Sequence, residues 1–149
     1  MKFSPYLMFN GDCEQAFQFY QQCLGGKLEL LRYSDGPEEM CAQLPAEWRD
    51  KVMHACLTVG DEMLMASDAP PGEQEPIKGF SVTIGIDDPD EAERAFNALA
   101  EGGNVRMSMQ QTFWSLRFGM LVDRFGVPWM VNCTRQPQTG TGESVAAAG

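Results

Sequence analysis

The stretch FSPYLMFNGDCEQAFQFYQQCLGG (residues 3–26) decides the fold, because FSVTIGIDDPDEAERAFNALAEGG (residues 80–103) repeats it without a gap. Both copies begin with Phe-Ser and end with Gly-Gly, and Phe19 falls on Phe96. An internal repeat indicates that one supersecondary unit occurs twice. We therefore expect two modules of the same architecture.

In the first copy, a short apolar strand at residues 6–9 leads into a predicted helix. Asp12 is expected to cap this helix, with Gln15 as its partner in a capping box. The helix should end at the two glycines, because glycine readily adopts the left-handed conformation that follows a helix. The core-facing stripe, at helical spacing, is predicted to be Ala16, Phe19, Tyr20 and Cys23.

The second copy predicts the same elements with different residues. Asp88 is the expected helix cap, and Pro89 takes the first helical position, where proline is favoured. Gly102-Gly103 ends the helix. The core-facing stripe is predicted to be Ala92, Ala95, Phe96 and Leu99.

Strands are predicted after each helix. They are 27–34, 53–59 and 62–68 after the first helix, then 104–110 and the two arms of a hairpin at 116–133. Gly60-Asp61 and the Asp-Arg-Phe-Gly stretch at 123–126 are the turns. The polar segment 35–51 is expected to contain one helical turn, at 46–51.

These elements predict an α+β fold with tandem βαβββ modules, in which curved mixed sheets carry their helices on the outer face. Such a sheet encloses a concave inner surface, where ligand sites usually form. The expected organisation is a first module at 1–68, a linker at 69–78, a second module at 79–134 and a flexible C-terminal tail at 135–149.

The composition restricts the class of partner. The 149 residues carry a formal net charge of −10 and contain no Lys or Arg cluster, so neither DNA nor RNA is expected to bind. No apolar run approaches the ~18 residues of a membrane span. The N-terminus shows no apolar signal-peptide segment, so we expect a cytoplasmic protein with no membrane partner.

The five cysteines are odd in number and form no CxxC pair, which favours reduced thiols in the cytoplasm. Most of them lie among apolar residues and should act as small core side chains. Cys13, in the first helical turn, is the one for which a lowered pKa is plausible. No His or Asn partner is evident for it, so a catalytic thiol is not predicted.

Two stretches carry a resemblance to a known family, PYLMFNGDCEQAFQFY (5–20) and QQTFWSLRFGMLVDRFGVPWMVN (110–132). With the hairpin near 54–68, they resemble the vicinal oxygen chelate superfamily of glyoxalase I, bleomycin-resistance proteins and extradiol dioxygenases, over about residues 3–133. The closer resemblance is to its PhnB-like branch, often labelled 3-demethylubiquinone 3-methyltransferase-like. Ser115-Leu116 departs from that branch, where relatives often carry Gly and a polar residue.

The resemblance implies a homodimer, commonly with modules exchanged between chains. It also implies a divalent metal in the concave site, held by His, Glu or Gln on the first and last strands of each module. Met130 falls where the last-strand carboxylate would lie, and Met65 is its counterpart in the first module. The first strands, 3–9 and 80–86, contain no His, Glu, Gln or Asp. A thioether suits Cu(I) better than Zn²⁺ or Mg²⁺, so we predict no metal and no other cofactor.

The candidate polar residues each have a structural and a functional interpretation. His54, the single histidine, is either a structural residue or a general base at the mouth of the site. Asp68 either turns the chain before Ala69-Pro70 or anchors a polar ligand. Arg117 is either a surface residue or an anchor for a carboxylate or phosphate.

The second half carries four aromatic residues close together in the sequence, which form either a core or a stacking surface for a planar ligand: Phe113, Trp114, Phe118 and Trp129. The predicted ligand site is lined by Leu7, Phe9, Met65, Trp114, Trp129 and Met130, with Asp68, His54 or Arg117 as polar partners.

Two functions follow from these residues. The first is the binding of a small organic molecule by a metal-free homodimer. The second is a glyoxalase- or lyase-type enzyme with a remodelled metal site or acid–base catalysis. Methyltransfer is not expected, because no glycine-rich loop follows a strand and opens a helix, as adenosyl and nucleotide cofactors require.

Overall fold

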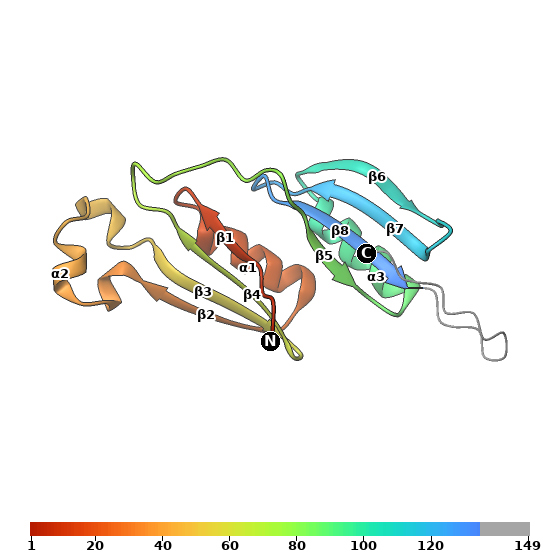
Figure 1. Ribbon diagram of the computed structural model, residues 1–149, viewed down its shortest axis with the longest axis horizontal. Coiled ribbons are helices and arrows are strands. Elements are labelled where there is room, and N and C mark those ends of the chain that lie inside the picture. Colours follow the sequence, from red (N-terminus) through yellow and green to blue (C-terminus); the bar gives the residue numbers. More distant parts are fainter. Residues whose placement is uncertain (135–149) are drawn as a thin grey trace. The chain divides into compact units, whose positions relative to one another are not determined.

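The computed structural model describes residues 1–134 as two compact units, Met1–Ile77 and a second that begins at Lys78 (Figure 1). The predicted tail at 135–149 lies outside the described residues. Each unit contains a four-stranded sheet and a twelve-residue helix. No helix among residues 1–134 is long and apolar enough to cross a membrane.

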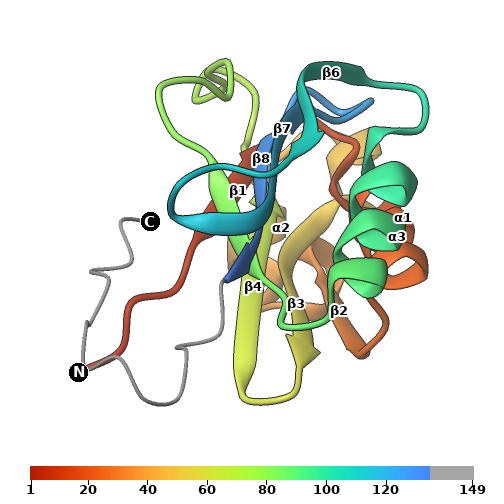
Figure 2. The ribbon, with the colours of Figure 1, turned by 90° about the vertical axis from the view of Figure 1, so that its right-hand side faces the viewer.

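The first unit forms a mixed sheet. Its elements are β1 (Tyr6–Phe9), α1 (Cys13–Leu24), β2 (Lys27–Arg32), the 3₁₀ turn η1 (Tyr33–Asp35), α2 (Glu38–Cys41), the 3₁₀ turn η2 (Ala46–Trp48), β3 (Val52–Val59) and β4 (Glu62–Asp68). The strand order is β1-β4-β3-β2, in which only β1 and β4 are parallel. Helix α1 packs on one side of these strands (Figure 2).

The second unit repeats this topology. Its elements are β5 (Val82–Gly85), α3 (Pro89–Ala100), β6 (Asn104–Gln110), β7 (Ser115–Val122) and β8 (Pro128–Thr134). The strand order is β5-β8-β7-β6, again with the first and last strands of the unit parallel. Helix α3 packs against β7 and β8 (Figure 2). The predicted α+β class with tandem βαβββ modules is confirmed.

The two helices are one residue out of phase with the gapless repeat. The predicted stripe of α3 is buried, but in α1 Phe17 is fully buried and Phe19 only partly so. The Phe17 ring packs edge-on against Phe9 of β1, with centroids 6.2 Å apart. The bounds of the two helices place Ala16 at the position of Ala92, and the second copy has one more residue, Glu101, between its helix and its two glycines.

The second glycine of each pair allows a strand to pass close by. A Cβ on Gly26 would lie 2.3 Å from the Thr58 carbonyl oxygen, and one on Gly103 would lie 2.3 Å from that of Val122. Real Cβ atoms do not approach an oxygen so closely, so a side chain there would push the paired strand away. The Gly-Gly repeat thus fixes the start of β2 and of β6.

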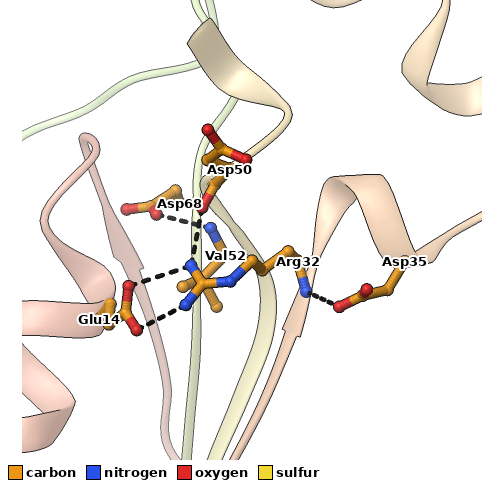
Figure 3. Close-up of polar contacts among 6 residues, drawn as sticks. All are labelled: Glu14, Arg32, Asp35, Asp50, Val52 and Asp68. Atoms are coloured by element: carbon orange, nitrogen blue, oxygen red, sulfur yellow. Dashed lines mark hydrogen bonds and ion pairs between the residues drawn. The ribbon is translucent and has the colours of Figure 1, made fainter.

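A distant carboxylate, and not the predicted Asp12, serves the start of α1. The Asp12 side chain makes no capping bond. Oδ1 of Asp68, at the end of β4, accepts hydrogen bonds from the Gly11 and Cys13 amides at 2.9 and 3.0 Å. Its Oδ2 accepts one from the Val52 amide at 2.9 Å (Figure 3). Asp68 is 1% exposed, so this one side chain joins the first turn of α1 to β3 and β4.

The segment between β2 and β3 contains more structure than the single turn expected at 46–51. It forms η1, α2 and η2 around a small core of its own, which consists of Tyr33, Cys41 and Trp48 with Leu44 and Met53 packed against them. The Tyr33 hydroxyl donates to the Asp68 carbonyl oxygen at 2.7 Å and holds the segment to the end of β4.

Arg32 fastens the end of β2 to α1. Its guanidinium donates two hydrogen bonds to the Glu14 carboxylate, at 3.0 and 2.7 Å, and one to the Asp50 carbonyl oxygen at 2.9 Å (Figure 3). Its amide donates to the Asp35 carboxylate at 2.8 Å. The hydrogen bonds from Arg32 lower the pKa of the Glu14 carboxyl. These contacts join three segments that are distant in the sequence.

Replacing Gly103 tests the close approach of its neighbouring strand. Gly103→Ala should lower the free energy of unfolding by about 1–3 kcal/mol, because the new methyl group overlaps backbone that cannot move independently. Gly85→Ala is the control, since no atom lies within 4 Å of its Cβ position. The control should be neutral or stabilising by up to about 1 kcal/mol. Equal urea midpoints for the two variants would contradict this account.

Replacing Asp68 tests its role as the shared acceptor. Asp68→Asn should lower the free energy of unfolding by about 2–4 kcal/mol, because the amide NH₂ would face a buried backbone N–H. Asp88→Asn is the matched control, since Asp88 is exposed and Asn caps a helix as well as Asp does. Urea unfolding followed by circular dichroism measures both. A loss below about 0.5 kcal/mol for Asp68→Asn would refute the proposed role.

Candidate functional site

The helix on each sheet divides the strand residues into two sets, because successive side chains of a strand point to opposite faces. On β1, Leu7 and Phe9 are 1% and 2% exposed and lie on the side that α1 covers. Tyr6 and Met8 are 45% and 43% exposed and lie on the other side. We call the face opposite the helix the open face of each unit.

The strand register assigns residues to each open face. The register of β1, β3 and β4 gives the first open face the following residues: Tyr6, Met8, His54, Cys56, Thr58, Met63, Met65 and Ser67. The second carries Thr83, Phe118, Met120, Met130 and Asn132 from β5, β7 and β8. Both faces combine methionine and aromatic side chains with a few hydroxyl and amide groups.

Three residues that the sequence placed on the ligand surface lie beneath the helices instead. Leu7, Phe9 and Trp129 occupy strand positions on the helix side and are at most 2% exposed. The Trp129 indole N–H donates to the Asp123 carboxylate at 2.8 Å. Oδ1 of Asp123 also accepts from the amides of Phe125 and Val127, which shapes the predicted turn. The apolar character of Leu7, Phe9 and Trp129 reflects core packing, so these three residues are not part of the candidate site.

The two methionines of interest do lie on the open faces, in equivalent positions. Met65 on β4 pairs with Tyr6 on β1, and Met130 on β8 pairs with Thr83 on β5. Each methionine therefore occupies the last strand of its unit, beside the first strand. Both side chains are partly exposed.

Two of the three predicted polar partners are engaged in structural contacts. Both carboxylate oxygens of Asp68 accept backbone hydrogen bonds on the helix side. Arg117 also lies on the helix side, where its Nε is 3.5 Å from a Glu93 carboxylate oxygen on α3. Its Nη1 donates to the Leu116 carbonyl oxygen at 2.9 Å. Neither side chain belongs to an open face.

His54 is the predicted polar partner that lies on an open face. Its Nδ1 is 3.2 Å from the Tyr6 hydroxyl, and the two rings are 5.8 Å apart. Ser67 of β4 lies beside His54 of β3. In this antiparallel pair of strands Ala55 pairs with Ala66, so the next residues outward, His54 and Ser67, are neighbours. Sequence reasoning missed Tyr6 and Ser67. Alternation along β1 and β4, counted outward from the buried residues, is the signal that would have indicated them.

Trp114 precedes β7 in an aromatic cluster. Its ring meets Phe113 and Phe118 edge-on, with centroids 4.6 and 5.5 Å away. Phe118 is on the second open face, and Phe113 is 84% exposed. The cluster therefore extends the apolar surface at one end of β7.

Cys13 does not have the lowered pKa that its place in the helix seemed to allow. Burial and the negative charge of Asp68 raise the pKa of the Cys13 thiol well above its usual value. A thiol held in its protonated form is a poor nucleophile and a poor metal ligand. Four of the five cysteines are buried, and Cys56 is partly exposed on the first open face.

The open faces do not fit a hard divalent cation. At the junction of the first and last strands, the paired residues are Tyr6 with Met65 and Thr83 with Met130. Zn²⁺ and Mg²⁺ prefer imidazole or carboxylate ligands, and none of these four supplies one. In residues 1–134, no three His, Cys, Asp or Glu side chains gather into a group that could hold a metal ion.

Comparisons with known proteins agree with this architecture. Protein YjdN of Escherichia coli (strain K12) is 37% identical over 147 residues, which cover 93% of this chain and 99% of YjdN. The crystal structure of protein PA1353 from Pseudomonas aeruginosa is 53% identical, has a TM-score of 0.82, and is matched over 91% of this chain and 99% of that one.

A structure with lower identity shares the fold. It is titled a putative 3-demethylubiquinone-9 3-methyltransferase, PhnB protein, from Bacillus cereus, with 24% identity, a TM-score of 0.68, and coverage of 90% of this chain and 100% of that one. A sequence model of the glyoxalase/bleomycin resistance protein/dioxygenase superfamily matches residues 2–131. With nearly the whole described chain matched, this protein belongs to the glyoxalase/bleomycin resistance protein/dioxygenase superfamily.

Proposed function

We propose that this chain is a PhnB-like binding protein that holds a small organic molecule on the open faces of its sheets, without the divalent metal of its superfamily. The observation that carries the proposal is the pair of equivalent methionines, Met65 and Met130, each on the last strand of its unit. The family resemblance implies metal ligands on these strands. In this chain the corresponding positions on the last strands carry thioethers.

The side chains of the first open face support an organic ligand. Tyr6, Met8 and Met63 are each more than 40% exposed, although all three are large and apolar. Exposed apolar residues gathered on one surface mark an interaction site. Methionine suits such a surface, because its flexible thioether adapts to ligands of irregular shape.

We also propose that the protein is a cytoplasmic homodimer. Each sheet ends in two edge strands, β1 and β2 in the first unit and β5 and β6 in the second. A second copy that covers edges and apolar faces would remove them from water. All five cysteines are free, which agrees with a reducing compartment.

A second candidate function rests on the contact between Tyr6 and His54. An imidazole 3.2 Å from a phenol hydroxyl can transfer a proton, so the first open face could serve a glyoxalase- or lyase-type reaction by acid–base catalysis. We rank this below binding, because a single such pair supplies neither a nucleophile nor a group that stabilises developing charge.

A ligand screen by thermal shift tests the binding function. Small aromatic and phosphonate-like compounds should include some that raise the melting temperature, because a ligand of the native state stabilises it by about 2.7 kcal/mol at a concentration of 100 times its Kd. Met65→Ala should reduce the shift. Met40→Ala is the control, since Met40 is 48% exposed on α2 and lies outside both open faces. Equal loss of the shift in both variants would count against the site.

Light scattering after size-exclusion chromatography tests the dimer. The account predicts a species of twice the 16.5 kDa chain mass at micromolar concentration. Increasing salt should not dissociate it, because apolar contacts are not screened by ions. A homogeneous 16.5 kDa species would exclude the homodimer.

A further inference from the structure

Three side chains of the first open face that can donate hydrogen bonds lie in two neighbouring rows of the sheet. Tyr6, His54 and Ser67 come from β1, β3 and β4, with β4 between the other two strands. The Tyr6 hydroxyl reaches across β4 to His54, and Ser67 is the neighbour of His54 on β4. The three side chains therefore surround one small area of the sheet.

The Tyr6–His54 pair keeps one donor proton that its own contact does not use. If the imidazole proton is on Nε2, the Tyr6 hydroxyl donates to Nδ1 and the Nε2–H remains. If the proton is on Nδ1, it is donated to the Tyr6 oxygen and the hydroxyl proton remains. In either tautomer the pair can donate one hydrogen bond to a ligand.

Ser67 is a buried donor with a poor acceptor. The residue is 6% exposed, and its hydroxyl donates to the Met8 sulfur at 3.4 Å. A thioether is a weak acceptor, so this bond compensates only part of the cost of removing a hydroxyl from water. A stronger acceptor in the same place would complete the bonding of Ser67.

The carboxylate next to these donors in the sequence, Asp68 of β4, faces the helix side and is bonded there to backbone amides. The acidic residue on the same row as Tyr6 is Glu29 on β2, which lies beyond Met65 and Cys56. Glu29 is exposed and forms an ion pair with Lys27 at 3.1 Å. On the open face, these donors therefore lie beside Met8 and Met65 of the neighbouring strand positions.

We propose that Tyr6, His54 and Ser67 form a subsite for the carboxylate of a small organic acid, whose apolar body lies on Met8 and Met65. An anion on an apolar surface needs several hydrogen-bond donors, and a carboxylate has two oxygens to accept from them. This inference rests on the proposed binding function and specifies the chemical class of the ligand.

Nuclear magnetic resonance of His54 provides the test, because the chain contains one histidine and its ring signals need no assignment. Benzoate and cyclohexanecarboxylate are the probes, and benzamide is the neutral analogue. Both acids should shift the ring signals in a saturable way, with a dissociation constant of about a millimolar, as expected for a fragment with few contacts. Benzamide should bind at least about tenfold more weakly.

Three isosteric variants locate the subsite. Tyr6→Phe and Ser67→Ala should each weaken benzoate binding by about two- to tenfold, the usual effect of removing one hydrogen bond. Thr58→Val is the control, because Thr58 is a hydroxyl residue farther along the same face of β3. It should bind benzoate as the parent does. Melting temperatures show that each variant is folded.

The outcomes separate this inference from the proposed function. If the acids fail to shift His54 while neutral compounds still raise the melting temperature, the carboxylate subsite is wrong and the binding function stands. If no compound of any charge stabilises the protein, both fail. Benzamide binding as tightly as benzoate, or unchanged benzoate affinity in Tyr6→Phe and Ser67→Ala, also refutes the subsite.

Discussion

A helix covers only one face of each sheet, and this constraint determines which side chains can meet a ligand. Because strand residues alternate, Leu7 and Phe9 are committed to the core under α1, while Tyr6 and Met8 are left on the open face. Burial of side chains such as Phe9 and Phe17 stabilises the first unit by about 1.5–3 kcal/mol per residue. The same alternation that builds the core therefore defines the candidate site.

Buried polar groups hold this arrangement in place. The Asp68 carboxylate is 1% exposed and accepts three backbone hydrogen bonds, which is how a buried charge is tolerated. It orients the first turn of α1 over β3 and β4, and Arg32 joins the end of β2 to Glu14 in the same turn. The sheet that carries the open face is thus joined to α1 by side chains of the chain itself.

Local patterns predicted the elements well and predicted long-range partners poorly. The repeat, the glycine pairs and the spacing of Ala92, Ala95, Phe96 and Leu99 are short-range signals, and the units they indicate are present. Asp12 satisfied every local rule for a helix cap, but Asp68, distant in the sequence, makes the bonds to the α1 amides. Apolarity alone likewise could not show that Leu7 and Phe9 face the helix.

At the junction of the first and last strands, the open faces carry thioethers and hydroxyls, where the family resemblance implies hard metal ligands. Elemental analysis of protein purified without chelators tests the proposed metal-free site most directly. The account predicts less than one equivalent of Zn, Mn, Fe, Ni or Mg per chain, before and after dialysis against each ion. One tightly held equivalent that is lost in His54→Gln would contradict the account and would favour the enzyme.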